Sequence, residues 1–414
     1  MRAHINRYKG NYKADCNLAT MPLNGQISGG TLYEDFESTA GWSVANGSIA
    51  ANVSQFKTGS QSIKMTCNAS LDAQMTKTVN WDLSGNWQHM LIWFYVHGAL
   101  TDYQAEYFYI KLANDAGLSN YMLGHISNAN KAAVGWNTYS LSKNDFTSGG
   151  SGTFASAIIR ERPELVGNAT GAAISYDSLY FGVTSLPGVM IWFDDGYASQ
   201  YAAFQYMKPK GIRASLSWES DTTNITLQQL LEMDRAGWTI ANHTDSSTVL
   251  TTLTEAQQET AISNCRTWLN TRGLTRGSNY LVYPGGGNDA NTITAMTNLG
   301  ILTGRNAKDA FGNGGQNQAL PFSSIWQLPA NSVTTAWTLA TVEGYIDEAI
   351  AGGYIMPLLF HNLGGGGGQW IVSDFNALMD YIYAKYKDGL IFPYTIDDFY
   401  NNSISSRKIP KANR

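Results

Sequence analysis

Residues 189–197, VMIWFDDGY, join a run of large apolar residues to two adjacent carboxylates, a glycine and an aromatic residue. Pro187 and Gly188 precede the apolar run, which predicts a short strand buried on both faces. Asp194 and Asp195 then follow the carboxyl end of a strand, where parallel sheets place their ligands. Because adjacent carboxylates repel, we expect a cation to hold one of them and leave the other to accept a proton.

The composition favours a neutral, aromatic-rich surface. Only 14% of the 414 residues are charged and the net charge is -5, which argues against nucleic acid as a partner. Tyr (23), Trp (12) and Gly (41) are abundant, as expected where the partner is a sugar. No segment approaches the roughly 20 apolar residues of a membrane helix, so no membrane partner is expected. Cys16, Cys67 and Cys265 are widely spaced, which predicts neither a disulfide framework nor a thiolate metal site.

The chain length predicts two domains with short appendages. Residues 1–30 are polar and lack a sustained period, which predicts an N-terminal arm. In residues 31–184, short alternating segments such as SQSIKMTC (60–67) are separated by turn residues, as is typical of an all-β sandwich. The segments DFES (35–38), TGSQSIKM (58–65), GWNTYSL (135–141) and YDSLYFG (176–182) resemble those of jelly-roll carbohydrate-binding modules.

The pattern changes after residues 185–188, SLPG, which predict a linker. From 189 to 402, helical segments such as TEAQQETAISNCRTWLNTRG (254–273) alternate with short apolar segments such as YLVYP (280–284). This alternation predicts an α/β domain with a parallel sheet or barrel. Residues 403–414 are left as a C-terminal tail.

The predicted strands of the α/β domain end on polar residues, and these ends should meet at one edge of the sheet. Two of the six histidines of the chain lie after the linker, and both fall at strand ends, which favours a functional role. In chain order the residues at the strand ends are Asp194, Asp195, Glu219, His243, Tyr283, Pro284, Gly285 and His361.

Four motifs over residues 189–400 resemble, in order, those of the polysaccharide deacetylase family of carbohydrate esterases. They are FDDGY (193–197), GWTIANHTDSSTVLTTLT (237–254), YPGG (283–286) and LLFHN (358–362). The resemblance implies a distorted (β/α) barrel and a metal-dependent hydrolase. The implied catalytic residues are Asp194 as base, His361 as general acid and Arg305, in LTGRN (302–306), as the residue that orients Asp194.

The resemblance also implies substrate contacts. Residues of the third motif would line the groove and offer backbone N–H groups to the oxyanion, and the last motif would form an apolar acetyl pocket. The implied substrate residues are Tyr283, Pro284, Gly285, Trp326 and Leu359. The third motif commonly carries an arginine two residues before its proline, where this chain has Val282.

The metal site departs from the family pattern. Asp195 and His243 match two of the usual ligands, but the second metal-binding histidine falls on Ser247. The third ligand is therefore open among Ser247 itself, Asp245 and Glu219. Zinc is the expected ion for a carboxylate and imidazole site, and cobalt or nickel would also fit.

Two functions follow from these patterns. The first is removal of N- or O-linked acetyl groups from a bacterial surface or capsular polysaccharide, with the sandwich holding the polymer. The alternative is a glycan-binding or structural protein of a phage tail with weak or no activity and a degenerate metal site. The segment MRAHINRYKGNYKADC (1–16) has no apolar run, so we expect no secretion signal. A polar arm, a sandwich and a glycan-cleaving domain together resemble a phage tail spike, which implies a virion-associated homotrimer acting outside the cell.

Overall fold

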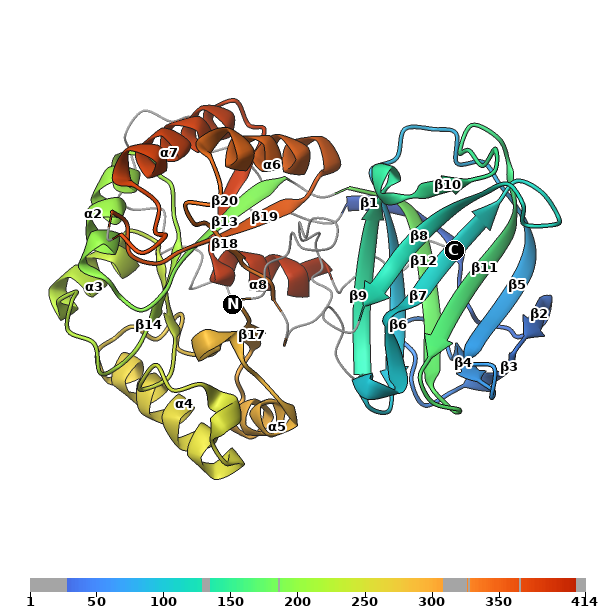
Figure 1. The fold of residues 1–414 in the computed structure, drawn as a ribbon, viewed down its shortest axis with the longest axis horizontal. Coiled ribbons are helices and arrows are strands. Elements are labelled where there is room, and N and C mark those ends of the chain that lie inside the picture. The colour runs from blue at the N-terminus through green and yellow to red at the C-terminus, as the bar shows by residue number, and fades with distance from the viewer. Residues whose placement is uncertain are drawn as a thin grey trace. The chain divides into compact units, whose positions relative to one another are not determined.

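The computed structural model describes residues 28–128, 135–184, 187–307, 326, 328–364 and 366–406. The chain divides into two compact units, one built around Ile27–Ser185 and the other around Leu186–Gln318 and Pro329–Arg414 (Figure 1). The division falls within the linker predicted at residues 185–188. Most of the predicted arm and most of the predicted tail lie outside the described residues.

The first unit contains two six-stranded antiparallel sheets. One has the order β3-β4-β12-β6-β9, with β1 paired to β12, and the other has the order β10-β8-β7-β11-β5-β2. The strands are β1 Ser28–Glu34, β2 Trp42–Ala45, β3 Gly47–Asn52, β4 Ser62–Cys67, β5 Asp72–Trp81, β6 His89–His97, β7 Tyr103–Ala113, β8 Tyr121–Asn128, β9 Gly135–Ser142, β10 Thr147–Gly149, β11 Ile158–Gly167 and β12 Ala173–Thr184. Two 3-10 helices are η3 Leu100–Asp102 and η4 Lys143–Asp145.

One apolar core fills the space between these two sheets. Alternate residues of β6 from one sheet and of β7 from the other belong to it, as the period of two predicts. They are Met90, Ile92, Phe94 and Val96 of β6 and Phe108, Ile110 and Leu112 of β7. The predicted all-β domain is therefore confirmed, while its jelly-roll type stays a prediction. Strand β1 starts at Ser28, slightly before the predicted boundary.

The second unit is built on one eight-stranded sheet with the order β17-β16-β15-β14-β13-β19-β18, and β20 pairs with β13. Every pairing in it is parallel. Within the described residues no pairing joins the outermost strands β17 and β18, so the predicted barrel is an open one. Its strands are β13 Gly188–Phe193, β14 Ser215–Trp218, β15 Thr239–Asn242, β16 Tyr280–Val282, β17 Thr303–Arg305, β18 Asn331–Ser332, β19 Ile355–Phe360 and β20 Phe392–Tyr394.

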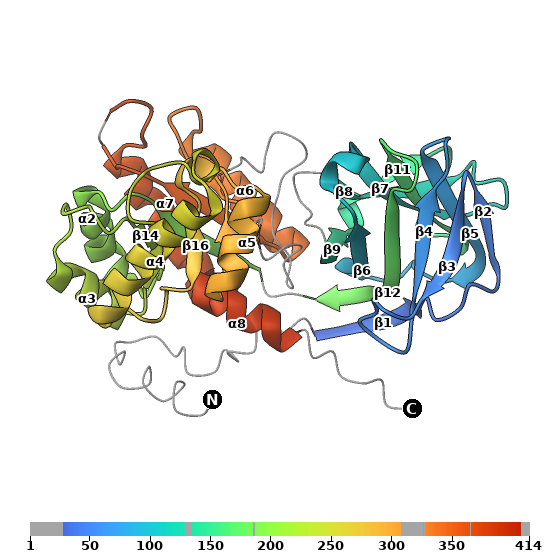
Figure 2. The same ribbon diagram turned by 90° about the horizontal axis from the view of Figure 1, so that it is seen from below.

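Helices surround this sheet on its outside (Figures 1 and 2). Helix α4 begins with Thr254 and Gln257 bonded reciprocally in a capping box, as the sequence predicts. None of the helices in the described ranges is both long and apolar enough to cross a bilayer. The helices are α2 Ala198–Met207, α3 Leu227–Arg235, α4 Glu255–Thr271, α5 Ala290–Leu299, α6 Leu339–Gly352, α7 Val372–Lys387 and α8 Ile396–Ser406, with the 3-10 helices η5 Lys208–Lys210, η6 Leu250–Thr252 and η7 Pro284–Gly286.

Strand β13 is the centre of the second unit, and it is buried along its whole length. It pairs with β14, β19 and β20. Phe193 stacks on Trp238 with 5.4 Å between ring centroids and also contacts Phe375 of α7, so this face of β13 packs against the helices. Trp192 lies on the opposite face, where the guanidinium carbon of Arg305 is 4.8 Å from its ring centroid. The predicted buried strand ending at Asp194 is confirmed.

Candidate active site

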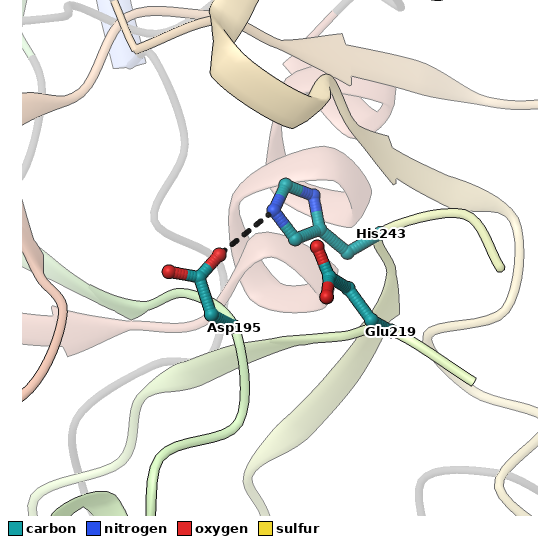
Figure 3. Close-up of side chains that lie close together, drawn as sticks. All are labelled: Asp195, Glu219 and His243. Atoms are coloured by element: carbon teal, nitrogen blue, oxygen red, sulfur yellow. Dashed lines mark ion pairs between the residues drawn. The ribbon is translucent and has the colours of Figure 1, made fainter. Parts of the chain in front are cut away.

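Three neighbouring parallel strands each place a polar side chain just after their carboxyl ends. Asp195 follows β13, Glu219 follows β14 and His243 follows β15. One ligand atom from each residue lies within 4.8 Å of the other two (Figure 3). Because the strands are adjacent and parallel, residues far apart in sequence form one cluster at the predicted edge of the sheet.

His243 is oriented by the backbone of the next strand. Its Nδ1 lies 2.9 Å from the carbonyl oxygen of Val282, and since a carbonyl only accepts, Nδ1 carries a proton. Its Nε2 lies 3.3 Å from Asp195 Oδ1. Burial lowers the pKa of His243, but Asp195 and Asp194 outweigh this effect and raise the pKa above its ordinary value. Nε2 and the Asp195 carboxylate therefore need a positive charge between them, which a proton or a metal cation supplies.

Glu219 is a buried carboxylate with an unsatisfied oxygen. The residue is 8% exposed, and its Oε1 has no hydrogen-bond partner among the described residues. Burial, together with the nearby charges of Asp195 and Asp221, raises the pKa of Glu219 to about 7 against the opposing effect of His243. A buried carboxylate oxygen without a donor is costly, and a cation in the cluster would satisfy it. The donor set therefore fits a divalent metal ion.

Asp194 lies in a different environment from its neighbour Asp195. Arg305 Nη2 donates to Asp194 Oδ1 at 2.6 Å and to Oδ2 at 2.5 Å, and the Ser217 hydroxyl donates to Oδ1. Burial raises the pKa of Asp194, but the charges of Arg305, His243 and His361 outweigh it and hold the pKa below its ordinary value. Asp194 therefore stays ionised at neutral pH, and the structure places Arg305 where the resemblance implies.

His361 follows β19, the other neighbour of β13, and is half-buried. The amide of Asp194 donates to the carbonyl of Phe360 at 3.1 Å, which ties the two strand ends together. Gln200 of α2 donates to the carbonyl oxygens of both Asp194 and His361. Gln200 and Ser217 were not identified from the sequence. For Ser217, period-two alternation along a predicted strand was the available signal.

The loops that carry Asp195 and His243 contain unusual backbone conformations. Asp195 has φ 71° and Thr244 has φ 66°, in the left-handed region that residues with a Cβ seldom adopt. The Thr244 amide donates to Asn242 Oδ1 at 2.8 Å, which helps to hold this conformation. Residues in such conformations cost about 1–3 kcal/mol each and cluster at functional sites.

Asp245 and Ser247 are the other residues that the sequence offers as the third metal ligand. Asp245 accepts a hydrogen bond from Asn264 Nδ2 of α4 at 2.6 Å, and Ser247 is exposed. The structure instead brings Glu219 to Asp195 and His243.

Two backbone amides of the third motif are used within the fold. The amide of Tyr283 donates to the carbonyl of Arg305 at 3.0 Å, and that of Gly286 donates to the carbonyl of Tyr283 at 2.9 Å. Pro284 has no N–H group, so the remaining amide of the YPGG motif is that of Gly285. The hydrogen bond from the Tyr283 amide continues the pairing of β16 with β17 beyond Val282.

The two remaining substrate predictions have different outcomes. Leu359 on β19 is fully buried and lies opposite Trp192 of β13, so its side chain belongs to the interior of the open barrel. Trp326 is half-buried, and the segment Ala319–Leu328 that contains it is grouped with the sandwich unit. The role of Trp326 as a substrate residue stays a prediction.

Comparison with known proteins assigns a family to this part of the chain. Residues 182–304 match the model of the family described as polysaccharide deacetylase. The matched segment contains Asp194, Asp195, Glu219 and His243. This match indicates a polysaccharide deacetylase domain in this part of the chain, and thus a hydrolase acting on carbon–nitrogen or ester bonds. No curated protein matches the chain.

Several solved structures are similar to the chain. A family 4 carbohydrate esterase from Streptomyces lividans in complex with acetate is 16% identical and has a TM-score of 0.35, covering 50% of this chain and 90% of that one. The peptidoglycan deacetylase PdaC from Bacillus subtilis is 13% identical and has a TM-score of 0.37, covering 53% and 93%. A family 11 carbohydrate-binding module from Clostridium thermocellum, in complex with a mixed-linked tetrasaccharide, is 14% identical with a TM-score of 0.29, covering 37% and 96%.

Proposed function

We propose that the second unit is a metal-dependent deacetylase that removes acetyl groups from a bacterial surface or capsular polysaccharide. The observation that carries this proposal is that two adjacent carboxylates lie in different surroundings suited to different roles. Asp195 lies in a cluster with a buried imidazole and a buried carboxylate, and Asp194 is held in its ionised form by Arg305. A metal site beside a separate ionised base is an arrangement suited to hydrolysis of an acetyl group by an activated water.

Asp195 and His243 would hold the cation, which when bound polarises the acetyl carbonyl and lowers the pKa of the attacking water. Asp194 accepts a proton from this water. Its Oδ1 already receives hydrogen bonds from Ser217 and Arg305, so Oδ2, which receives one bond from Arg305, is the atom with a lone pair to spare. His361 then protonates the leaving amine or alkoxide.

One face of the sandwich supports a role in holding the polymer. Residues facing away from its core form a row across β4, β12, β6 and β9, in which each is paired with the next. The row consists of Lys64, Ser175, Tyr95 and Trp136. The rings of Tyr95 and Trp136 have their centroids 5.4 Å apart, and both residues are half-buried. Half-buried aromatic rings beside polar side chains suit stacking on sugar rings.

Acetate release from a panel of N-acetylated and O-acetylated bacterial polysaccharides tests the proposal. We expect the wild-type protein with added Zn²⁺ or Co²⁺ to release acetate from at least one of them. The Asp194→Asn variant keeps the shape of the side chain and should bind metal as the wild type does but release no acetate. Binding of a polysaccharide without acetate release by the wild type would contradict the proposal and favour a glycan-binding protein.

A further inference from the structure

We infer that Glu219 is the third protein ligand of the metal, taking the part that the resembled family gives to a second histidine. This inference rests on the metal centre of the proposed function and names a residue that none of the four motifs contains. The resembled family has two imidazoles and one carboxylate as ligands, whereas this chain would have one imidazole and two carboxylates. Position, burial and charge each support it.

The order of the strands places Glu219 beside Asp195 and His243. Strand β14 lies between β13 and β15, so the residue that follows β14 lies between the residues that follow its neighbours. The parallel register of Trp218 with Asn242 brings Glu219 level with His243, and the ligand atoms of Glu219, Asp195 and His243 all lie within 4.8 Å of one another. In Figure 3 the Glu219 carboxylate points toward the space that the other two side chains also face.

The carboxylate of Glu219 is buried, and one of its oxygens lacks a donor among the described residues. Glu219 is more than nine-tenths buried, and its Oε1 receives no hydrogen bond in the described part of the chain. The nearby backbone groups are already used, because the Ser220 amide donates to the carbonyl of Thr244, and the Cys265 thiol donates to the carbonyl of Trp218. A buried oxygen with no donor that faces two potential ligands is the feature that a bound cation explains.

The charges around the cluster also favour a bound cation. Arg305 is 1% exposed and balances Asp194, so it is committed to that carboxylate. When both are ionised, Asp195 and Glu219 carry two negative charges beside a single imidazole, and a divalent cation would balance them. Carboxylates alone would repel one another. This cluster also contains the ring of His243, which the carbonyl of Val282 orients.

A donor set with two carboxylates is harder than the set with two imidazoles. Carboxylates suit Mn²⁺ and similar hard ions, while imidazole suits Zn²⁺, Ni²⁺ and Cu²⁺. We therefore expect the affinity of this site for Mn²⁺ to depend on the charge of Glu219 more strongly than its affinity for Zn²⁺ does. This difference is a readout that a merely structural role of Glu219 would not produce.

Calorimetric titration of the chelator-stripped full chain with Zn²⁺ and with Mn²⁺ tests the inference. Glu219→Gln, which keeps the size of the side chain, should weaken Zn²⁺ binding by at least the roughly 10- to 100-fold that outer-shell partners contribute. The loss for Mn²⁺ should be larger. Asp245→Asn and Ser247→Ala serve as matched controls, since Asp245 is bonded to Asn264 and Ser247 is exposed, and they should leave both affinities unchanged.

Two outcomes would overturn the inference, and they are distinguishable from failure of the proposed function. If Asp195→Asn loses Zn²⁺ binding while Glu219→Gln binds as the wild type does, Glu219 is not a ligand but the proposed metal centre stands. If Asp245→Asn loses binding in place of Glu219→Gln, the third ligand is Asp245. Should Glu219→Gln not fold, Glu219→Asp keeps the charge on a shorter side chain, and unchanged Zn²⁺ affinity in that variant would count against coordination.

Discussion

Two adjacent aspartates show how the surroundings, more than the residue type, decide what a carboxylate does. Asp194 is buried against Arg305 and Ser217, which keep it ionised and fixed in orientation. Asp195 turns through a left-handed backbone conformation and lies beside His243. The two residues are adjacent in the chain, but the strand end directs Asp194 toward Arg305 and Asp195 toward His243 and Glu219.

Removing the guanidinium of Arg305, which pairs with Asp194, should destabilise the fold. Arg305→Met leaves a buried carboxylate unpaired, so we expect a loss of about 3–5 kcal/mol in the free energy of unfolding. The double variant Asp194→Asn/Arg305→Met removes both charges and should recover much of this loss. Urea unfolding of the wild type, both single variants and the double variant measures the coupling, and strictly additive losses would show that the ion pair is not a unit.

The metal-free protein should lose stability as the pH rises through the range in which Glu219 titrates. The pKa of Glu219 is about 7 in the folded chain against 4.5 for the free group, so the fold favours the protonated form. Below pH 4.5 both states hold the proton and no effect is seen. Between 4.5 and 7 the unfolded chain releases the proton first, and the folded state loses up to about 3 kcal/mol, which stays lost above pH 7.

Unfolding in chelator at pH 5 and pH 8 checks this expectation. The wild type should be less stable at pH 8, and Glu219→Gln, which cannot titrate, should lose correspondingly less between the two values. Identical pH dependence in both proteins would show that Glu219 does not carry the effect. Saturation with Zn²⁺ should remove most of the difference, since a bound cation favours the ionised carboxylate.

Among the strands, the sequence predicts those that end at residues of the candidate active site. The apolar runs before Asp194 and His361 are buried strands, and the histidines lie at strand ends as expected. Strand β14 is only four residues long, and Glu219, which follows it, belongs to no motif, so the sequence alone left the third ligand open among three residues. The choice depends on which strands become neighbours, and local patterns do not contain that information.

Pairing between distant segments also determines which hydrogen bond the amide of Tyr283 makes. Its amide is used by β17, a strand whose partner in the sheet could not be read from its own three residues. The alternation of helices and strands predicts a parallel sheet but does not state how far it closes, and the described strands leave it open between β17 and β18.

The packing of β17 against β16 makes a specific prediction. A Cβ at Gly304 would lie 1.8 Å from the Tyr283 hydroxyl oxygen, and that side chain is buried against Met296. Gly304→Ala should therefore destabilise the fold by about 1–3 kcal/mol through overpacking, and it should lower activity because Arg305 is the next residue. Gly344→Ala in the exposed part of α6, where a Cβ meets nothing, is the matched control and should stabilise by about 0.4–1 kcal/mol. Equal thermal stability of the two variants would contradict this account of β17.

At the scale of the whole molecule, the chain joins a hydrolase domain to a β-sandwich whose outward face carries aromatic rings. If that face holds the polymer, Tyr95→Ala should weaken polysaccharide binding by about tenfold, equivalent to about 1.4 kcal/mol. Tyr121 is a tyrosine of similar burial on β8 of the other sheet, so Tyr121→Ala is the control and should bind normally. Equal binding by the two variants in affinity electrophoresis would remove the sandwich face from the proposal. The trimeric, virion-associated state implied by the tail-spike resemblance stays a prediction that light scattering can test.

Metal-restored acetate release tests directly whether the second unit is a metal-dependent deacetylase. The full chain is stripped with chelator, supplied with an acetylated polysaccharide, and titrated with Zn²⁺ or Co²⁺ while acetate and bound metal are both quantified. Our account predicts no acetate from the stripped protein, release that rises in proportion to bound metal up to one ion per chain, and none from Asp195→Asn at the same metal concentration. Acetate release that continues in chelator, or that is unchanged in Asp195→Asn, would contradict it.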